Sequence, residues 1–171
     1  MKYKKTLITF IVVTMGLILF SCGTSQTALE KAQQAELLSE HIKNFNFKFK
    51  ATHAYPQNYK SIYLSSIYDV TVSPDSVQAY LPYYGRAYTA PMNPSEGGIK
   101  FISTDFKYEI EEGRKAGNWL IKIRTADTSR PYVLSFDLWE NGSARLSVED
   151  RDRQAISFQG NLEIIEQEDR N

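Results

Sequence analysis

The stretch that decides the fold is Tyr132-Val133-Leu134-Ser135-Phe136-Asp137-Leu138-Trp139-Glu140-Asn141-Gly142-Ser143-Ala144-Arg145-Leu146-Ser147-Val148. Apolar and polar residues alternate on both sides of Glu140-Asn141-Gly142, which predicts two half-buried strands joined by a tight turn. A two-residue turn at Asn141-Gly142 would set Leu138 opposite Arg145. A three-residue loop with Gly142 in the left-handed conformation sets Leu138 opposite Ala144 instead. We predict the second register, because a one-residue slip would expose a whole apolar set.

The same alternation recurs along the chain and predicts further strands. Their apolar sets are Phe45, Phe47, Phe49 and Ala51; Tyr68, Val70 and Val72; Val77, Ala79, Leu81 and Tyr83; Ile102, Phe106, Tyr108 and Ile110; Trp119, Ile121 and Ile123; and Ile156, Phe158, Leu162 and Ile164. A turn at Ser73-Pro74-Asp75-Ser76 pairs Val72 with Val77 and Val70 with Ala79. Short connections between consecutive strands predict a mainly β fold (α+β by count). We expect an antiparallel meander of about eight strands after one helix, an open or closed barrel-like sheet with one apolar face.

The helix is expected at Ala28 to about Lys43. Thr27-Ala28-Leu29-Glu30 has the pattern of a capping box, in which the threonine hydroxyl and the glutamate carboxylate bind exposed backbone N–H groups. The apolar positions near helical spacing are Leu29, Ala32, Ala35, Leu38 and Ile42. We expect this face to pack on the apolar, concave side of the sheet, or the sheet to curl into a barrel around that side, because the other side of the sheet is polar.

The N-terminal region has the pattern of a lipoprotein signal peptide. Lys2, Lys4 and Lys5 precede an apolar run, Thr6–Phe20, that ends just before Cys22. The run is shorter than the roughly 20 residues that span a bilayer. Leu19-Phe20-Ser21-Cys22 resembles a bacterial lipobox, and that resemblance implies cleavage after Ser21 and acylation of Cys22.

These features predict four segments. Residues 1–21 form a cleaved lipoprotein signal peptide, 22–27 a lipidated tether, 28–165 a single helix-plus-antiparallel-sheet domain and 166–171 a polar tail. The expected location is the cell envelope, with a lipid anchor in the outer membrane rather than the inner one, facing the periplasm or the cell exterior. The short tether keeps the domain close to the membrane surface.

The charge and cysteine content limit the kinds of partner and of covalent cross-link that we expect. Without residues 1–21 the chain carries 17 basic and 20 acidic residues, a balance that argues against a nucleic-acid partner. Cys22 is the single cysteine, so no disulfide is expected to hold the domain together.

Few residues point to catalysis. The chain has two histidines, His41 and His53, and neither has a partner at metal-ligand spacing. Asp150 and Asp152 are expected to be solvated turn residues. We therefore expect no catalytic residues, no metal site, no cofactor and no enzymatic activity.

The strongest binding signals are tyrosines and one long connection. Eight of the eleven tyrosines fall between Tyr55 and Tyr88, and the connection Gly85–Gly98 is rich in Pro, Ser and Gly. The binding candidates are Tyr80, Tyr84, Arg86, Tyr88 and Met92. Asp75-Ser76-Val77 also resembles an acceptor for O-linked glycans on exported bacterial proteins, which makes Ser76 a candidate glycosylation site.

Several blocks resemble a family of small bacterial envelope lipoproteins catalogued as domain of unknown function 4251. They are Asn46–Ala54, Tyr68–Val77, Tyr83–Tyr88, Pro94–Phe101 and Arg153–Phe158. The resemblance runs from about residue 40 to 163, implies a lipoprotein without an established activity, and carries over no catalytic residues.

Three functions remain open at this point. One is non-catalytic binding of a small apolar molecule, lipid or glycan, in the concave side of the sheet or under the Gly85–Gly98 connection. The second is a structural or accessory role in which that connection docks an envelope protein. A hydrolase is the third possibility, and it would need Asp69 or His53 to lie in a deep cleft.

Overall fold

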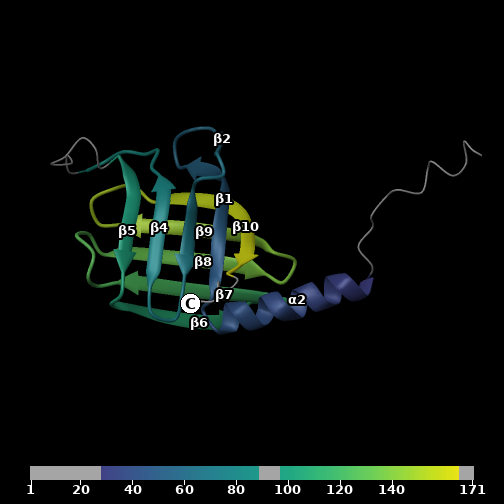
Figure 1. Cartoon of the computed structure of the whole chain (residues 1–171). Coiled ribbons are helices and arrows are strands. Elements are labelled where there is room, and N and C mark those ends of the chain that lie inside the picture. Colours follow the sequence, from purple (N-terminus) through teal and green to yellow (C-terminus); the bar gives the residue numbers. More distant parts are fainter. Residues whose placement is uncertain (1–27, 89–96, 166–171) are drawn as a thin grey trace, which may run out of the picture. The chain divides into compact units, whose positions relative to one another are not determined.

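The computed structural model of the chain describes residues 28–88 and 97–165 (Figure 1). By compactness the chain divides into two units, residues 1–31 and 32–171, and all the strands belong to the second. The arrangement given below is that of the second unit.

Helix α2 spans Ala28–Lys43, as expected. Thr27 of the expected capping box lies outside the described residues. The expected apolar face is buried only in the last two turns, at Leu38 and Ile42, whereas Leu29 and Ala32 are exposed. Of the two expected arrangements, the second is found: the sheet curls into a nearly closed barrel, and of the expected helix face only Leu38 and Ile42 join the buried core.

The chain leaves the helix through a left-handed residue, Phe45, with φ of 51°. The N–H of Asn46 donates to the carbonyl oxygen of His41 at 2.9 Å, and the N–H of Phe45 donates to that of Ile42 at 3.1 Å. These two bonds form a Schellman motif, in which glycine is the usual left-handed residue. Phe45 thus ends the helix instead of starting the first strand, and its ring packs 3.8 Å from that of Tyr108, centroid to centroid.

Ten strands form one antiparallel sheet in the described part of the chain. They are β1 (Phe47–Pro56), β2 (Ile62–Tyr63), β3 (Asp69–Val72), β4 (Val77–Pro82), β5 (Gly98–Ser103), β6 (Phe106–Glu112), β7 (Asn118–Thr125), β8 (Tyr132–Trp139), β9 (Ser143–Asp150) and β10 (Ile156–Ile164).

The strand order is β5-β4-β3-β1-β10-β9-β8-β7-β6, with β2 paired to β1. Two meanders are therefore joined where the first strand pairs with the last, and β5 and β6 are the free edges of a nearly closed barrel. Both predicted registers are confirmed: Val72 pairs with Val77, and Leu138 pairs with Ala144. Gly142 has the expected left-handed conformation, with φ of 83°.

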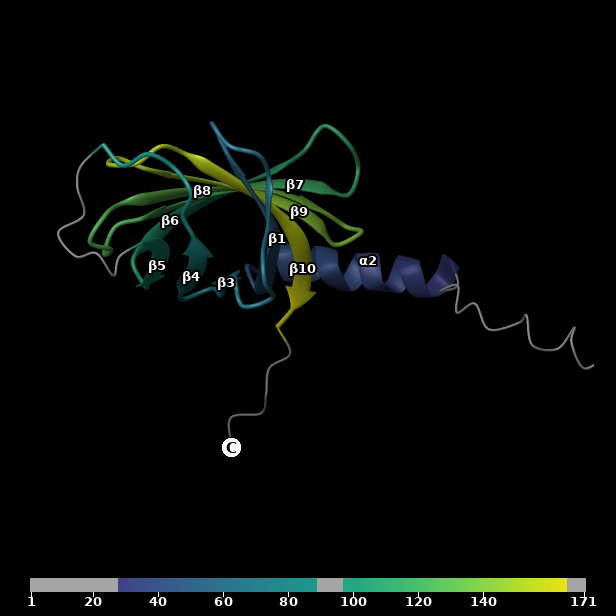
Figure 2. The ribbon, with the colours of Figure 1, turned by 90° about the horizontal axis from the view of Figure 1, so that it is seen from above.

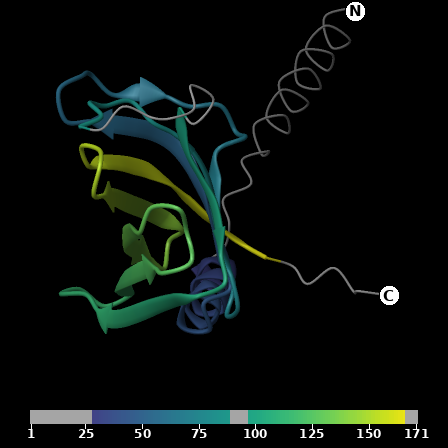
Figure 3. The same cartoon turned by 90° about the vertical axis from the view of Figure 1, so that its left-hand side faces the viewer.

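The two halves of the barrel cross. Figure 1 shows β1, β3, β4 and β5 running steeply across β6–β9, and Figures 2 and 3 show the sheet curling so that the halves face each other. The turn between them is made by β1, which has a bulge between Ala51 and His53, and by β10. At this crossing a Cβ on Gly160 would lie 1.9 Å from the carbonyl oxygen of Lys50, so only glycine fits.

The interior is filled by large apolar side chains from both halves. Phe47 and Phe49 of β1 are fully buried, and their rings meet that of Phe136 on β8 edge to face, with centroids 5.6 Å and 6.1 Å apart. A side chain with no exposed surface has no water-sized space beside it. The core between the halves is thus packed around these rings.

One predicted strand is two strands. Ile102 was expected on the same face as Phe106, but β5 ends at Ser103, and Ile102 is 64% exposed on the outer surface opposite Gln78. The chain turns at Thr104-Asp105, where the Asp127 carboxylate accepts hydrogen bonds from both N–H groups, at 2.8 Å and 3.1 Å. Because the chain turns at this cap, the alternation of inward and outward side chains in β5 does not continue into β6.

Candidate functional site

The most distinctive polar group of the fold is a buried ion pair in the β9–β10 connection. Arg153 Nε donates to Asp150 Oδ2 at 2.8 Å, and the two side chains are only 7% and 4% exposed. Asp150 Oδ1 accepts a second hydrogen bond from the N–H of Asp152 at 2.7 Å. Both carboxylate oxygens are therefore bound, as a buried charge requires.

Arg153 reaches two further strands. Its Nη1 donates to the carbonyl oxygen of Gly98 at 3.1 Å, and its Nη2 donates to the Tyr132 hydroxyl at 3.2 Å. The guanidinium carbon lies 4.8 Å from the centroid of the Tyr83 ring, a cation–π contact. One side chain thus links the end of β9 to the beginnings of β5 and β8.

The two tyrosines of this cluster keep their protons. Burial raises the pKa of Tyr83 and of Tyr132 above the ordinary value, although the positive charge of Arg153 acts in the opposite direction. The Tyr83 hydroxyl donates toward two carbonyl oxygens, that of Gln154 at 2.9 Å and that of Arg86 at 3.0 Å. The cluster therefore holds positions without offering a base at neutral pH.

The first part of the Gly85–Gly98 connection is fixed to this cluster through its backbone. The N–H of Gln154 donates to the carbonyl oxygen of Arg86 at 3.0 Å, and the N–H of Tyr88 donates to that of Asp152 at 2.8 Å. Ala87 and Arg153 form an isolated antiparallel bridge. Since Gly98 is also bound to Arg153, both ends of the connection are held by the β9–β10 connection.

The predicted binding residues fall into separate places. Arg86 and Tyr88 lie together in the part of the connection that is bound to the β9–β10 connection. We call this pair of residues the rim; both are exposed, Tyr88 by 68%. Tyr84 is half-buried and packs against the core. Tyr80 lies elsewhere, on the outer face of β4. Met92 lies outside the described residues.

Tyr80 belongs to a row of outward side chains. Its ring stacks on that of Tyr68, with centroids 5.6 Å apart, and Lys100 Nζ lies 4.7 Å from its centroid. Asp69, opposite Tyr80 in the register, accepts from Lys50 Nζ at 2.9 Å. This row is a separate surface from the rim of Arg86 and Tyr88.

The residues kept for possible catalysis do not form a reactive site. His53 lies half-buried, 5.3 Å from the ring of Tyr63 between centroids, with Nδ1 3.1 Å from the Thr52 hydroxyl. Asp69 is bound to Lys50 as described. No group of three or more His, Cys, Asp or Glu side chains that could hold a metal ion occurs in residues 28–88 and 97–165.

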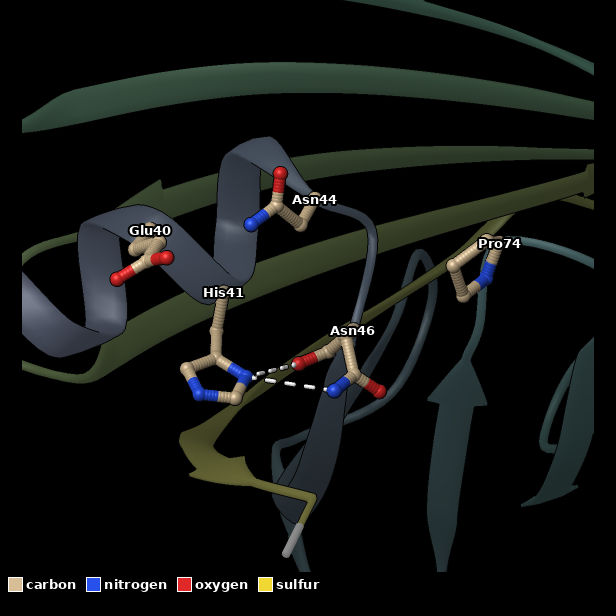
Figure 4. A pocket seen from close by; sticks show the side chains of 5 residues that line it. All are labelled: Glu40, His41, Asn44, Asn46 and Pro74. Carbon is tan, nitrogen blue, oxygen red and sulfur yellow. Dashed lines mark hydrogen bonds between the residues drawn. The ribbon is translucent and has the colours of Figure 1, made fainter. Parts of the chain in front are cut away.

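A small pocket lies where α2 ends beside the β3–β4 turn. It has a volume of about 300 Å³ and is lined by Glu40, His41, Asn44, Asn46 and Pro74 (Figure 4). His41 Nδ1 lies 3.1 Å from the Asn46 carbonyl oxygen and 3.4 Å from Asn46 Nδ2, so it donates to the carbonyl when it is protonated and accepts from the amide when it is not. Ser76, the glycosylation candidate, lies in the same turn, half-buried, and its hydroxyl donates to Asp75 Oδ1 at 3.3 Å.

Arg153 was not predicted from the sequence as a site residue, and Asp150 was predicted in the wrong environment. Asp150 was expected to be solvated in a turn with Asp152, but its side chain is buried by the ion pair. In Glu149-Asp150-Arg151-Asp152-Arg153 every residue is charged, and no local pattern distinguishes the buried pair from its exposed neighbours. Only the long-range contacts with Gly98 and Tyr132 do so.

Cys22, the lipidation candidate, lies outside the described residues. Within the residues that the structure describes, no helix is both long enough and apolar enough to span a bilayer.

The family model described as "Domain of unknown function (DUF4251)" matches residues 29–162, and the chain belongs to this family. Among solved structures, the chain is similar to the crystal structure of a DUF4251 family protein from Bacteroides eggerthii DSM 20697. The two share 12% identity with a TM-score of 0.58, over 78% of this chain and 89% of the other. At this identity the likeness concerns the fold alone. No curated protein matches the sequence.

Proposed function

We propose that the protein is a lipid-anchored protein of the bacterial envelope, without catalytic activity, that docks a partner protein through the rim formed by Arg86 and Tyr88. The observation that carries this proposal is the double attachment of the connection between β4 and β5 to Arg153. A surface held this rigidly loses little conformational freedom when a partner binds it.

The residue types at the rim support docking. Tyrosine and arginine are enriched among the residues that dominate binding energies at protein interfaces. Tyr88 is 68% exposed although its backbone is bound to Asp152. A partner would therefore meet a side chain that is presented by a fixed backbone.

The packed interior favours docking over a ligand held inside the barrel. Phe47, Phe49, Leu134 and Leu146 all have no exposed surface. An apolar ligand on the concave side would need to displace such side chains, and the cost of opening that core would oppose binding.

A photo-crosslinking amino acid at position 88, in cells of the native host, tests the docking proposal. We expect one reproducible adduct from position 88 and none from a control at Arg145, which is exposed on β9. Equal crosslinking from both positions, or no adduct from position 88, would contradict the proposal.

Glycan binding is the second candidate, and the pocket at Glu40, His41, Asn44 and Asn46 favours it. Carboxylate, imidazole and amide groups suit the hydroxyls of a sugar. Native mass spectrometry of protein purified from its own host should then detect a bound sugar that Asn46→Ala removes. A ligand-free mass for the wild-type protein would count against this candidate.

The anchor is proposed from the lipobox-like sequence at Cys22. Two or more acyl chains on this cysteine would hold the protein at the membrane, since one chain binds only marginally. We expect an intact mass that lacks residues 1–21 and includes acyl chains. An unmodified Met1 or a free thiol at Cys22 would contradict the anchor. A mass that Ser76→Ala lowers by no more than the one oxygen atom of the serine hydroxyl would exclude the glycan at Ser76.

A further inference from the structure

Strand β6 is an open edge of the sheet. Among the described residues it pairs with β7 alone, and it forms the lower margin of the crosswise strands in Figure 1. Phe106 is half-buried and the other six residues of the strand are exposed. A strand edge of seven residues offers unpaired backbone N–H and C=O groups to another strand.

Apolar side chains continue up to this edge. Tyr108 and Ile110 lie opposite Ile123 and Ile121 of β7, which are 0% and 1% exposed. Tyr108 and Ile110 themselves remain 48% and 38% exposed. The inner face of the sheet is therefore fully covered at β7 and only partly covered at β6, where the ring of Phe45 packs against that of Tyr108 and leaves the rest of Tyr108 and Ile110 exposed.

Two charges on the outer face of β6 lack an ion-pair partner. Lys107 lies opposite Arg124, a like charge, and Arg124 Nη1 is already 2.8 Å from Glu109 Oε1. Neither Lys107 nor Glu111 forms an ion pair with any described residue. The two lie at equal distances along the strand on either side of Glu109.

We propose that the β6 edges of two copies of this chain pair antiparallel, about a two-fold axis that passes through Glu109. Lys107 of each copy then lies opposite Glu111 of the other, and Tyr108 opposite Ile110 of the other. The dimer therefore contains two Lys107–Glu111 charge pairs, and two contacts between Tyr108 and Ile110 cover the exposed apolar side chains. Such a self-complementary patch is what a two-fold dimer interface requires.

This register is favoured over a neighbouring one. Pairing centred on Tyr108 would set Lys107 against Glu109, which Arg124 already binds, and Asp105 against Glu111, a like charge. It would also extend the pairing to Thr104 and Asp105, whose N–H groups are bound by Asp127. Pairing centred on Glu109 also sets one like charge against itself, Glu109 of each copy, but each of these carboxylates is bound by Arg124 of its own chain. This pairing uses Phe106–Glu112 in full and nothing beyond it.

A cysteine at the axis tests the proposal in the full-length chain. Across an antiparallel pair a residue that faces its own copy has Cα atoms about 4.5–5.5 Å apart, within reach of a disulfide. We expect Glu109→Cys to give a covalent species of twice the chain mass on a non-reducing gel of cell membranes. The control is Glu149→Cys on β9, both of whose edges are paired, and the wild-type chain reports any contribution from Cys22. No excess over these two controls, or an adduct of another mass, would overturn the proposal.

Charge exchange then tests the register. In the Glu109→Cys chain, Lys107→Glu and Glu111→Lys should each weaken self-association about tenfold or more, because two attractive pairs become repulsive. The double variant should restore the covalent dimer. Lys107→Glu places an acid opposite Arg124 and so should leave the thermal midpoint unchanged or raised. If Glu111→Lys has no effect, or the double variant fails to restore the dimer, the proposed register is overturned.

Discussion

Arg153 Nη1 lies 3.1 Å from the carbonyl oxygen of Gly98, on a connection that is 55 residues away in the chain. The backbone of Arg153 also bridges Ala87, where the same connection leaves β4. A residue between β9 and β10 therefore sets both the exit and the re-entry of the chain between β4 and β5. The rim proposed for docking depends on a side chain that is itself buried.

Arg153→Ala should lower the free energy of unfolding by about 3–5 kcal/mol, because it leaves the Asp150 carboxylate buried without its partner. The exposed neighbour Arg151 is the control, and Arg151→Ala should change this free energy by less than about 0.5 kcal/mol. Denaturant unfolding measures both. The double variant Arg153→Met with Asp150→Leu, which removes both charges, should lose less than Arg153→Ala; an equal loss would mean that the ion pair is not the cause.

Gly160→Ala should destabilise the junction of β1 and β10 by at least about 2–3 kcal/mol, since the added Cβ would lie 1.9 Å from the Lys50 carbonyl oxygen. Gly97→Ala is the matched control, because a Cβ there meets no atom within 4 Å. The thermal midpoints of the two variants, measured under the same condition, test this prediction. Similar midpoints would contradict the close approach of the strands.

Gly142→Ala should cost about 1–2 kcal/mol through backbone strain alone, because φ is 83° and the nearest atom to an added Cβ is 3.9 Å away. Asparagine tolerates the left-handed conformation better than alanine. Gly142→Asn should therefore be the more stable of the two variants in equilibrium unfolding. The opposite order would indicate that contacts, and not the dihedral angle, require glycine here.

The cap at Asp127 should make stability depend on pH. Hydrogen bonds from the Ser103 hydroxyl and from the N–H groups of Thr104 and Asp105 hold the pKa of Asp127 well below its usual range. The lowered pKa means that this contribution is present above about pH 4 and is lost as the pH falls through the folded-state value.

Asp127→Asn should accordingly be less stable than the wild-type protein near about pH 6, and the difference should shrink below about pH 4. Unfolding curves at several pH values measure this difference. A difference that stays constant down to about pH 3 would show that the carboxylate charge does not matter for the cap.

Local alternation predicted most of the sheet, because each strand buries one face against a common core. The pairs Val72–Val77 and Leu138–Ala144 followed from turn chemistry and parity. The split at Ser103 was missed, since Asp127 caps it from a distant segment. Phe45 was assigned to the first strand because it continues the alternation of Phe47 and Phe49, and neither its left-handed conformation nor its contact with the distant Tyr108 follows from that pattern.

The candidate site was predicted only in part. Arg86 and Tyr88 were found from the composition of their connection, and both prove to be exposed at one rim. Arg153 could not be found, because what distinguishes it from Arg151 is contact with Tyr132 and Gly98. Tyr80 faces outward as its parity predicted, but the register of β4 puts it on another surface.

The pairing of β1 with β10 also determines when the domain can fold. Phe47, at the start of the first strand, lies opposite Ile164, at the end of the last. Contacts so distant in sequence form slowly, because the intervening chain must be ordered before they compensate for its lost entropy. During synthesis the first meander must wait for the last strand, so a chain truncated before Ile156 should leave β1 as an unprotected edge prone to aggregation.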